Sequence, residues 1–223
     1  MKVSNPLSPS TSFIFSIKAI NIFLVCCLFL WIFEVILFFK LSEEQLFRLV
    51  NGNHNSFFDI FFYWISFIGT FSVIGSVLIL LVLIKYKSWN IFGLFAFTQL
   101  IPFLINQGLK LYFAQPRPSI VFGGQPWFHA VEGVQLHTGL SFPSGHTAGA
   151  FAFFTLLSML LPARQKLWAI LFFILAVLVA YSRIYLGQHF FVDVFAGSMV
   201  GTVLPLIIFL IWEHFQKRKQ NPK

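Results

Sequence analysis

Residues 20–39 read INIFLVCCLFLWIFEVILFF, a run of twenty in which Glu34 is the one charged residue. A helix of this length is about 30 Å long, which matches the hydrocarbon thickness of a bilayer. The run is too long for the apolar part of a cleaved signal peptide, and no small-residue cleavage site follows it before Lys40. We therefore interpret it as a retained transmembrane helix.

The composition of the whole chain is that of a membrane protein. Of its 223 residues, 58% are hydrophobic and 10% are charged, and the mean hydropathy is +0.83. A water-soluble domain of this length could not bury so much apolar surface. Five more apolar runs follow the first, at 57–84, 89–112, 147–161, 167–186 and 190–212. The sequence predicts one all-α domain over residues 1–223, a polytopic bundle with six transmembrane helices.

The net charge of +8 follows this predicted topology and does not indicate a nucleic-acid partner. Lys110, Arg117 and Arg183 belong to motifs described below. Of the other twelve basic residues, ten fall on one side of the six-span arrangement, and only Lys40 and Arg48 fall on the other. Cytoplasmic segments of membrane proteins carry such an excess of Lys and Arg. We therefore expect both termini in the cytoplasm and the motif residues on the outer face.

Three segments complete this arrangement. We expect a cytoplasmic N-terminal segment at 1–18, an outward-facing loop at 114–142 and a basic cytoplasmic tail at 213–223. Within the loop, residues 123–128 read GGQPWF. Aromatic rings favour the headgroup region of a bilayer, so we expect this part of the loop to contact the lipid outside its phosphate.

The first polar cluster lies at the end of the third apolar run. Lys110 and Arg117 flank a segment in which Pro116 and Pro118 favour an extended chain. The result is two cations close to the outer membrane surface. Either they extend to lipid headgroups, as Lys and Arg near helix ends do, or they bind an anionic ligand.

The second cluster is Pro-Ser-Gly-His-Thr at 143–147, directly before an apolar run. Ser144 is a good helix N-cap, and the free N–H groups of the first helical turn can bind an anion. Gly145 lets a ligand approach the backbone closely, and His146 is placed to transfer a proton. Ordinary helix capping is the alternative interpretation.

The third cluster reads SRIYLGQHFFVD over residues 182–193. His189 and Asp193 are four residues apart, so on one helix face the carboxylate can hold one ring nitrogen and present the other. Gly187 is expected to separate two helices, with Arg183 at the end of the first. A structural hydrogen bond between His189 and Asp193 is the alternative to a nucleophile held by an orienting acid.

Together the three clusters place three cations, two histidines, one aspartate and a helix N-terminus on one side of the bilayer, a combination that binds phosphate. The other acidic residues are scattered along the chain, so we expect no metal site and no cofactor. The cations must then neutralise the phosphoryl charge themselves.

The third apolar run has a further polar pattern. Gln99, Asn106 and Lys110 are spaced by seven and four residues, which places them nearly in line along a helix. They form either a polar groove leading inward from Lys110 or a set of hydrogen bonds between helices.

The motifs resemble those of the type 2 phosphatidic acid phosphatase superfamily. That family is defined by Lys-x6-Arg-Pro, then Pro-Ser-Gly-His, then Ser-Arg-x5-His-x3-Asp, and all three are present here in that order. The resemblance implies that His189 attacks phosphorus and forms a phosphohistidine, that Asp193 orients it, and that His146 protonates the leaving oxygen and later activates water. It also implies a set of phosphate-binding residues: Lys110, Arg117, Ser144, Gly145 and Arg183.

The predicted function is hydrolysis of a lipid phosphomonoester or diphosphate in a bacterial inner membrane. The substrates that the resemblance offers are undecaprenyl diphosphate, phosphatidic acid, phosphatidylglycerol phosphate and lipid A. A lipid phosphotransferase would use the same residues. A small transporter also fits six helices with an inward polar line, but it leaves the three motifs without a purpose.

Overall fold

The computed structural model of the protein describes residues 17–85 and 89–220, and this part of the chain is helical, with no β-strand. The predicted all-α fold is confirmed for these residues. The helices are α1 (Ile17–Lys40), α2 (Glu43–Asn51), α3 (Ser56–Lys85), α4 (Trp89–Phe113), α5 (Pro118–Phe122), α6 (Gly145–Leu160), α7 (Trp168–Tyr185) and α8 (Phe191–Gln220), with a 3-10 turn at Ala163–Gln165.

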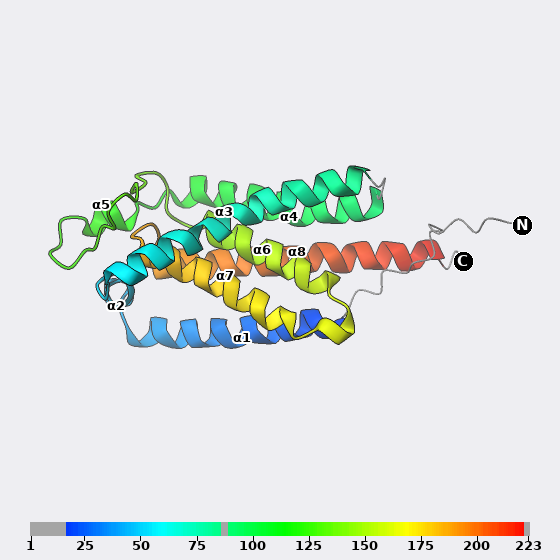
Figure 1. Cartoon of the computed structure of the whole chain (residues 1–223), viewed down its shortest axis with the longest axis horizontal. Helices are drawn as coiled ribbons and strands as arrows, with labels where there is room; N and C mark the ends of the chain where they lie inside the picture. The colour runs from blue at the N-terminus through cyan, green and yellow to red at the C-terminus, as the bar shows by residue number, and fades with distance from the viewer. Residues whose placement is uncertain (1–16, 86–88, 221–223) are drawn as a thin grey trace, which may run out of the picture.

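The six longer helices run along the length of the molecule, whereas α2 and α5 lie together at one end (Figure 1). Four stretches among the described residues are long and apolar enough to cross a membrane: Ile20–Lys40, Ile91–Phe122, Trp168–Tyr185 and Phe191–Gln216. Two shorter apolar stretches, Ser56–Gly69 and Gly145–Leu160, belong to α3 and α6. The protein is therefore an integral membrane protein.

The outward surface of α1 shows the effect of this environment. Phe23 and Cys27 are buried against the bundle, whereas Phe29, Phe33 and Phe39 are exposed, Phe39 by 88%. In a water-soluble bundle such a face would be polar. Here it suits contact with lipid hydrocarbon.

The short helix α2 packs against the loop at 114–142. It starts with a capping box, in which Ser42 accepts the Gln45 N–H and the Gln45 side chain accepts the Ser42 N–H. Its Phe47 is fully buried, with ring centroids 6.0 Å from Phe128 and 6.2 Å from Trp127. The aromatic residues of the 123–128 segment, expected to reach lipid headgroups, thus pack against α2.

The backbones of α6 and α8 approach each other closely. A Cβ atom added at Gly201 would lie 2.3 Å from the carbonyl oxygen of Ala148, and one at Gly197 would lie 2.7 Å from that of Ser144. Two glycines four residues apart let helix backbones approach closely in membranes. This contact lines up the start of α6 with the start of α8.

The polar residues Gln99, Asn106 and Lys110 along α4 differ in their surroundings. The Gln99 side chain accepts a hydrogen bond from Ser76 of α3 at 3.3 Å and donates to the Ala152 carbonyl of α6 at 3.4 Å. These are bonds between helices, as the second of the two interpretations requires. Asn106 is buried nearer to Lys110, with its side-chain nitrogen 3.6 Å from the position of a Cβ at Gly145.

Parts of the expected terminal segments lie outside the described residues, namely 1–16 of the N-terminal segment and 221–223 of the tail. Residues 213–220 of the expected tail continue α8 as a helix.

The α6–α8 contact predicts the effect of a single methyl group. Gly201→Ala would push that group against the Ala148 carbonyl, and overpacking of this kind costs about 1–3 kcal/mol. We expect the unfolding midpoint in detergent, followed by intrinsic fluorescence, to fall by roughly 2–12 °C. The matched control is Gly93→Ala in α4, where an added Cβ meets nothing within 4 Å. Equal midpoints for the two variants would contradict the close contact.

Candidate active site

The connection between α7 and α8 carries the third motif. The backbone carbonyl of Arg183, in the last turn of α7, accepts hydrogen bonds from the N–H groups of Gln188 at 3.0 Å and His189 at 3.1 Å. Gly187 adopts a φ of +68°, a left-handed conformation that favours glycine. This tight connection places His189 two residues before α8 begins at Phe191. His189 therefore precedes the helix that carries Asp193, and the prediction from the sequence that the two residues share a helix face is wrong.

His189 is buried, with 2% of its surface exposed, and its ring is held on both sides. Its Nδ1 lies 3.2 Å from Asp193 Oδ2 and 3.5 Å from Ser141 Oγ, and its Nε2 lies 3.4 Å from Nη1 of Arg117. When Nδ1–H donates to the carboxylate, the lone pair of the neutral ring is on Nε2. The ring therefore presents a nucleophilic nitrogen toward the guanidinium of Arg117.

Asp193 is fully buried and held by several donors. Its Oδ2 accepts hydrogen bonds from the Ser141 hydroxyl and, at 2.8 Å, from the Phe190 N–H. Its backbone carbonyl accepts the Ser144 N–H at 2.9 Å. The same residue thus orients His189 and joins α8 to the start of α6.

The second motif forms the N-terminus of α6. Ser144 is its N-cap, and the Ser144 Oγ accepts hydrogen bonds from the N–H and the hydroxyl of Thr147, at 3.4 and 2.9 Å. Gly145 is the first helical residue. The His146 side chain lies against Gly69 of α3, since a Cβ at Gly69 would be 3.1 Å from its ring. His146 follows Ser144 by two residues, and the Ser144 N–H bonds to the carbonyl of Asp193, so both imidazoles belong to the end of the bundle where α6 and α8 begin.

The two cations of the first motif are bonded to the chain that precedes α6. The Lys110 Nζ donates to the carbonyl oxygens of Leu140 and Ser141, both at 3.0 Å. The Arg117 Nε donates to the carbonyl of Gly139 at 3.2 Å. These bonds fix both side chains beside His189, and a Lys or Arg head keeps further N–H groups for a ligand.

Arg183 is the most buried of the three cations, with 6% of its surface exposed. Its Nε has no hydrogen-bond partner among residues 17–85 and 89–220. Buried polar groups are nearly always paired, so an unpaired donor beside two histidines suits an anionic ligand.

Residues 135–141 form a segment that lines the site. Besides the bonds to Lys110 and Arg117, the Gln135 carbonyl accepts from the Gln188 side chain at 3.0 Å, and the His137 carbonyl accepts from Ser119 at 3.3 Å. The segment is therefore attached to α5 and to the α7–α8 connection.

The electrostatics of the site keep His189 neutral. Burial, together with the positive charges of Arg117, Arg183 and Lys110, holds the pKa of His189 well below its usual range. The pKa of His137, in the segment 135–141, is also lowered by burial and by Arg117 and Arg183. A neutral imidazole beside fixed cations can attack an electrophile that carries negative charge.

The structure thus brings together all eight residues expected from the three motifs: His189, His146, Asp193, Lys110, Arg117, Ser144, Gly145 and Arg183. In the described part of the chain, no group of three or more His, Cys, Asp or Glu side chains is arranged to hold a metal ion. The chemistry of these groups is binding of an anion, nucleophilic attack by a nitrogen and proton transfer by a second imidazole.

Three residues of the site could not be identified from the sequence alone: Ser141, Gln188 and His137. Ser141 contacts both His189 and Asp193, yet a serine in a loop has no spacing that reveals such a role. The Gln188 carbonyl accepts from Arg117 at 2.8 Å. The position of Gln188 next to His189 in the sequence is the signal that could have identified it.

Comparison with known proteins agrees with this site. A family model described as the PAP2 superfamily matches residues 88–217, which include all three motifs. The undecaprenyl-diphosphatase BcrC of Bacillus subtilis is 29% identical over 74% of this chain and 81% of its own. The lipid A 4'-phosphatase of Porphyromonas gingivalis is 30% identical over 79% of this chain and 75% of its own.

A solved structure shares the fold. The transmembrane PAP2-type phosphatidylglycerolphosphate phosphatase of Bacillus subtilis superposes with a TM-score of 0.63 at 24% identity, covering 86% of this chain and 96% of its own. The family model alone covers more than half of the chain. The protein therefore belongs to the PAP2 superfamily and is an integral membrane member of this family of lipid phosphatases.

Proposed function

We propose that the protein hydrolyses a lipid phosphomonoester or diphosphate through a phosphohistidine on His189. The observation that carries this proposal is the position of the ring, with Nδ1 3.2 Å from the Asp193 carboxylate and Nε2 3.4 Å from Arg117. An orienting acid on one side and a cation on the other are what attack on a phosphoryl group needs.

The first step forms a nitrogen–phosphorus bond and breaks the bond from phosphorus to the leaving oxygen. His189 Nε2 attacks in line with that oxygen, and His146 gives it a proton, so that an alcohol or a lipid phosphate leaves. Lys110, Arg117 and Arg183 stabilise the negative charge on the other phosphoryl oxygens, helped by the Gly145 N–H and the Ser144 hydroxyl.

The second step returns the enzyme to its starting state. His146, now neutral, takes a proton from water, and the resulting hydroxide attacks phosphorus. The nitrogen–phosphorus bond breaks, and inorganic phosphate leaves with His189 neutral again. Asp193 keeps the Nδ1 proton in place throughout, which holds the ring in the correct tautomer.

The names of the relatives support a lipid substrate. They are an undecaprenyl-diphosphatase and a lipid A 4'-phosphatase, and the structural neighbour is a phosphatidylglycerolphosphate phosphatase. We propose undecaprenyl diphosphate, phosphatidic acid, phosphatidylglycerol phosphate and lipid A as the substrate set.

For the topology we propose six transmembrane helices, namely α1, α3, α4, α6, α7 and α8. The site would face the periplasm or cell exterior of a bacterial inner membrane, with both termini and the segments 1–18 and 213–223 in the cytoplasm. The loop at 114–142 would face outward. The charge bias supports this direction, because the end of the bundle that holds the site carries few cations besides those of the motifs.

The roles of the two histidines predict different phenotypes. His189→Ala removes the nucleophile, so phosphate release should fall by at least about 10³-fold and no acid-labile phosphoenzyme should form. His146→Ala should slow cleavage of an alkyl phosphate by roughly 10²-fold, but with p-nitrophenyl phosphate it should accumulate phosphoenzyme. The control is His214→Ala, at the far end of α8. Full activity of His189→Ala would exclude the mechanism.

The electrostatic environment of His189 predicts a shift in the pH profile. Burial and Arg117 lower the pKa of His189, so the wild type should keep its reactive neutral ring to a pH well below that of an ordinary histidine. Arg117→Gln removes a positive charge, raises this pKa and should move the acid limb of kcat/KM to higher pH. Arg117→Lys keeps the charge and should leave the limb near its wild-type position. Identical limbs for Gln and Lys would contradict the coupling.

The source of charge stabilisation predicts the response to chelators. Because Lys110, Arg117 and Arg183 supply the positive charge, purified protein should release phosphate at the same rate in EDTA as in magnesium. With a labelled lipid diphosphate, the label should appear as inorganic phosphate. Label on a second lipid would favour a phosphotransferase, and loss of activity in EDTA would require a metal.

A further inference from the structure

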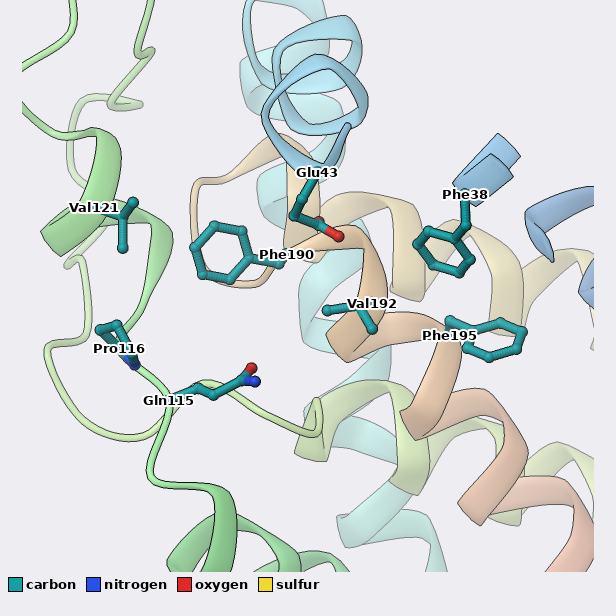
Figure 2. Close-up of a pocket in the computed structure, with 8 residues that line it drawn as sticks. All are labelled: Phe38, Glu43, Gln115, Pro116, Val121, Phe190, Val192 and Phe195. Carbon is teal, nitrogen blue, oxygen red and sulfur yellow. The ribbon is translucent and has the colours of Figure 1, made fainter. Parts of the chain in front are cut away.

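A cavity of about 610 Å³ lies beside the active site, between α1, α2, α5 and α8 (Figure 2). Its wall consists mainly of apolar side chains. The lining residues are Phe38, Glu43, Gln115, Pro116, Val121, Phe190, Val192 and Phe195.

The cavity shares its walls with the catalytic residues. Phe190 follows His189 directly, Val192 precedes Asp193, and Pro116 precedes Arg117. The Ser141 N–H also donates to the carbonyl of Gln115 at 2.9 Å, which joins this wall to the site. An atom group attached to a phosphate held by Arg117 therefore has this apolar space within a short distance.

The far end of the cavity is formed by aromatic rings. Phe38 of α1 packs edge-on against Phe195 and Phe191 of α8, with ring centroids 5.4 and 5.7 Å apart. In the view of Figure 2, Phe38 and Phe195 stand together on one side of the cavity, and Val121 and Pro116 stand on the other. These side chains have no hydrogen-bonding groups.

Only two lining side chains are polar. Glu43 points toward the middle of the cavity from the start of α2, and its Oε1 accepts the Phe191 N–H at 2.6 Å (Figure 2). A carboxylate is an acceptor and cannot satisfy another acceptor. Gln115 is thus the one lining side chain with an amide donor for a ligand.

The apolar lining of the cavity favours one of two kinds of lipid over the other. In a diacylglycerol phosphate, ester groups lie within a few bonds of the phosphate, and ester oxygens placed against this wall would have only the Gln115 amide as a side-chain donor, which would cost free energy. In a polyprenyl phosphate, hydrocarbon begins at the first carbon atom. The apolar wall next to His189 suits the second kind.

We infer that this cavity holds the first isoprenoid units of a polyprenyl phosphate or diphosphate, and that its wall selects such lipids over diacylglycerol phosphates. The inference rests on the proposed function, because it places the chain of the lipid whose phosphate His189 attacks.

The selection is tested with the full-length protein in detergent and lipids matched in their anionic group. Geranylgeranyl and dioleoylglycerol, each as monophosphate and as diphosphate, are compared by phosphate release at equal mole fraction in the micelle. We expect kcat/KM to be at least about tenfold higher for the prenyl member of the pair that is hydrolysed. Equal values would overturn the selection.

The location is tested by filling the cavity. Val121→Trp should lower the ratio of kcat/KM for geranylgeranyl substrate to kcat/KM for p-nitrophenyl phosphate by roughly tenfold. The matched control is Ile120→Trp, whose side chain is 58% exposed and does not line the cavity. A second pair is Phe38→Ala with Phe39→Ala as control. An unchanged ratio in both Val121→Trp and Phe38→Ala would overturn the location.

A binding measurement separates failure of this inference from failure of the proposed function. A geranylgeranyl phosphate carrying a diazirine near its first isoprenoid unit is photolysed with wild-type protein, and the labelled peptides are identified by mass spectrometry. Labelling at Phe38, Val121 or Phe195 that excess geranylgeranyl phosphate prevents would support the cavity even if no lipid phosphate were hydrolysed. Labelling confined to other surfaces would overturn it even in an active enzyme.

Discussion

The close approach of α6 and α8 is the constraint on which the rest of the site depends. Gly197 and Gly201 leave no space for a side chain against the α6 backbone, so the two helices meet directly. Their starts are then joined by the bond from the Ser144 N–H to the Asp193 carbonyl. The start of α6 and the carboxylate that contacts His189 therefore come from rigid elements, and their separation is fixed by backbone contact.

Next to this pair of helices, backbone carbonyl oxygens stabilise the partly buried positive charges of the site. The carbonyls of residues 139–141 accept hydrogen bonds from Lys110 and Arg117, and these bonds hold two cations close to a third, Arg183. Three cations near one another are costly without an anion. Burial and the same three positive charges keep the pKa of His189 low, so the site suits an anion and keeps this imidazole neutral.

The polar site adjoins an apolar cavity with very little structure between them. One residue, His189, faces Arg117, and the next, Phe190, lines the cavity. Glu43 links the two regions from α2, since it lines the cavity and also accepts the N–H of Phe191 at the start of α8. A lipid has the same division between a charged end and a hydrocarbon chain, so both parts can be held at once.

The sequence by itself determined the membrane setting, the helices and the eight motif residues. Apolar runs of about 20 residues define helices through length and hydropathy alone, and the spacing of His189 and Asp193 predicts their contact, although His189 lies two residues before α8 and not on its face. The bounds of these runs lie within about three residues of the helix bounds in the structure, except that the last run, predicted to end at 212, continues in α8 to Gln220. Only the tertiary structure decided which distant residues complete the site, such as Ser141 on Asp193, and which way the aromatic residues at 127 and 128 turn. Such contacts depend on how loops fold back across the bundle, and no local periodicity encodes them.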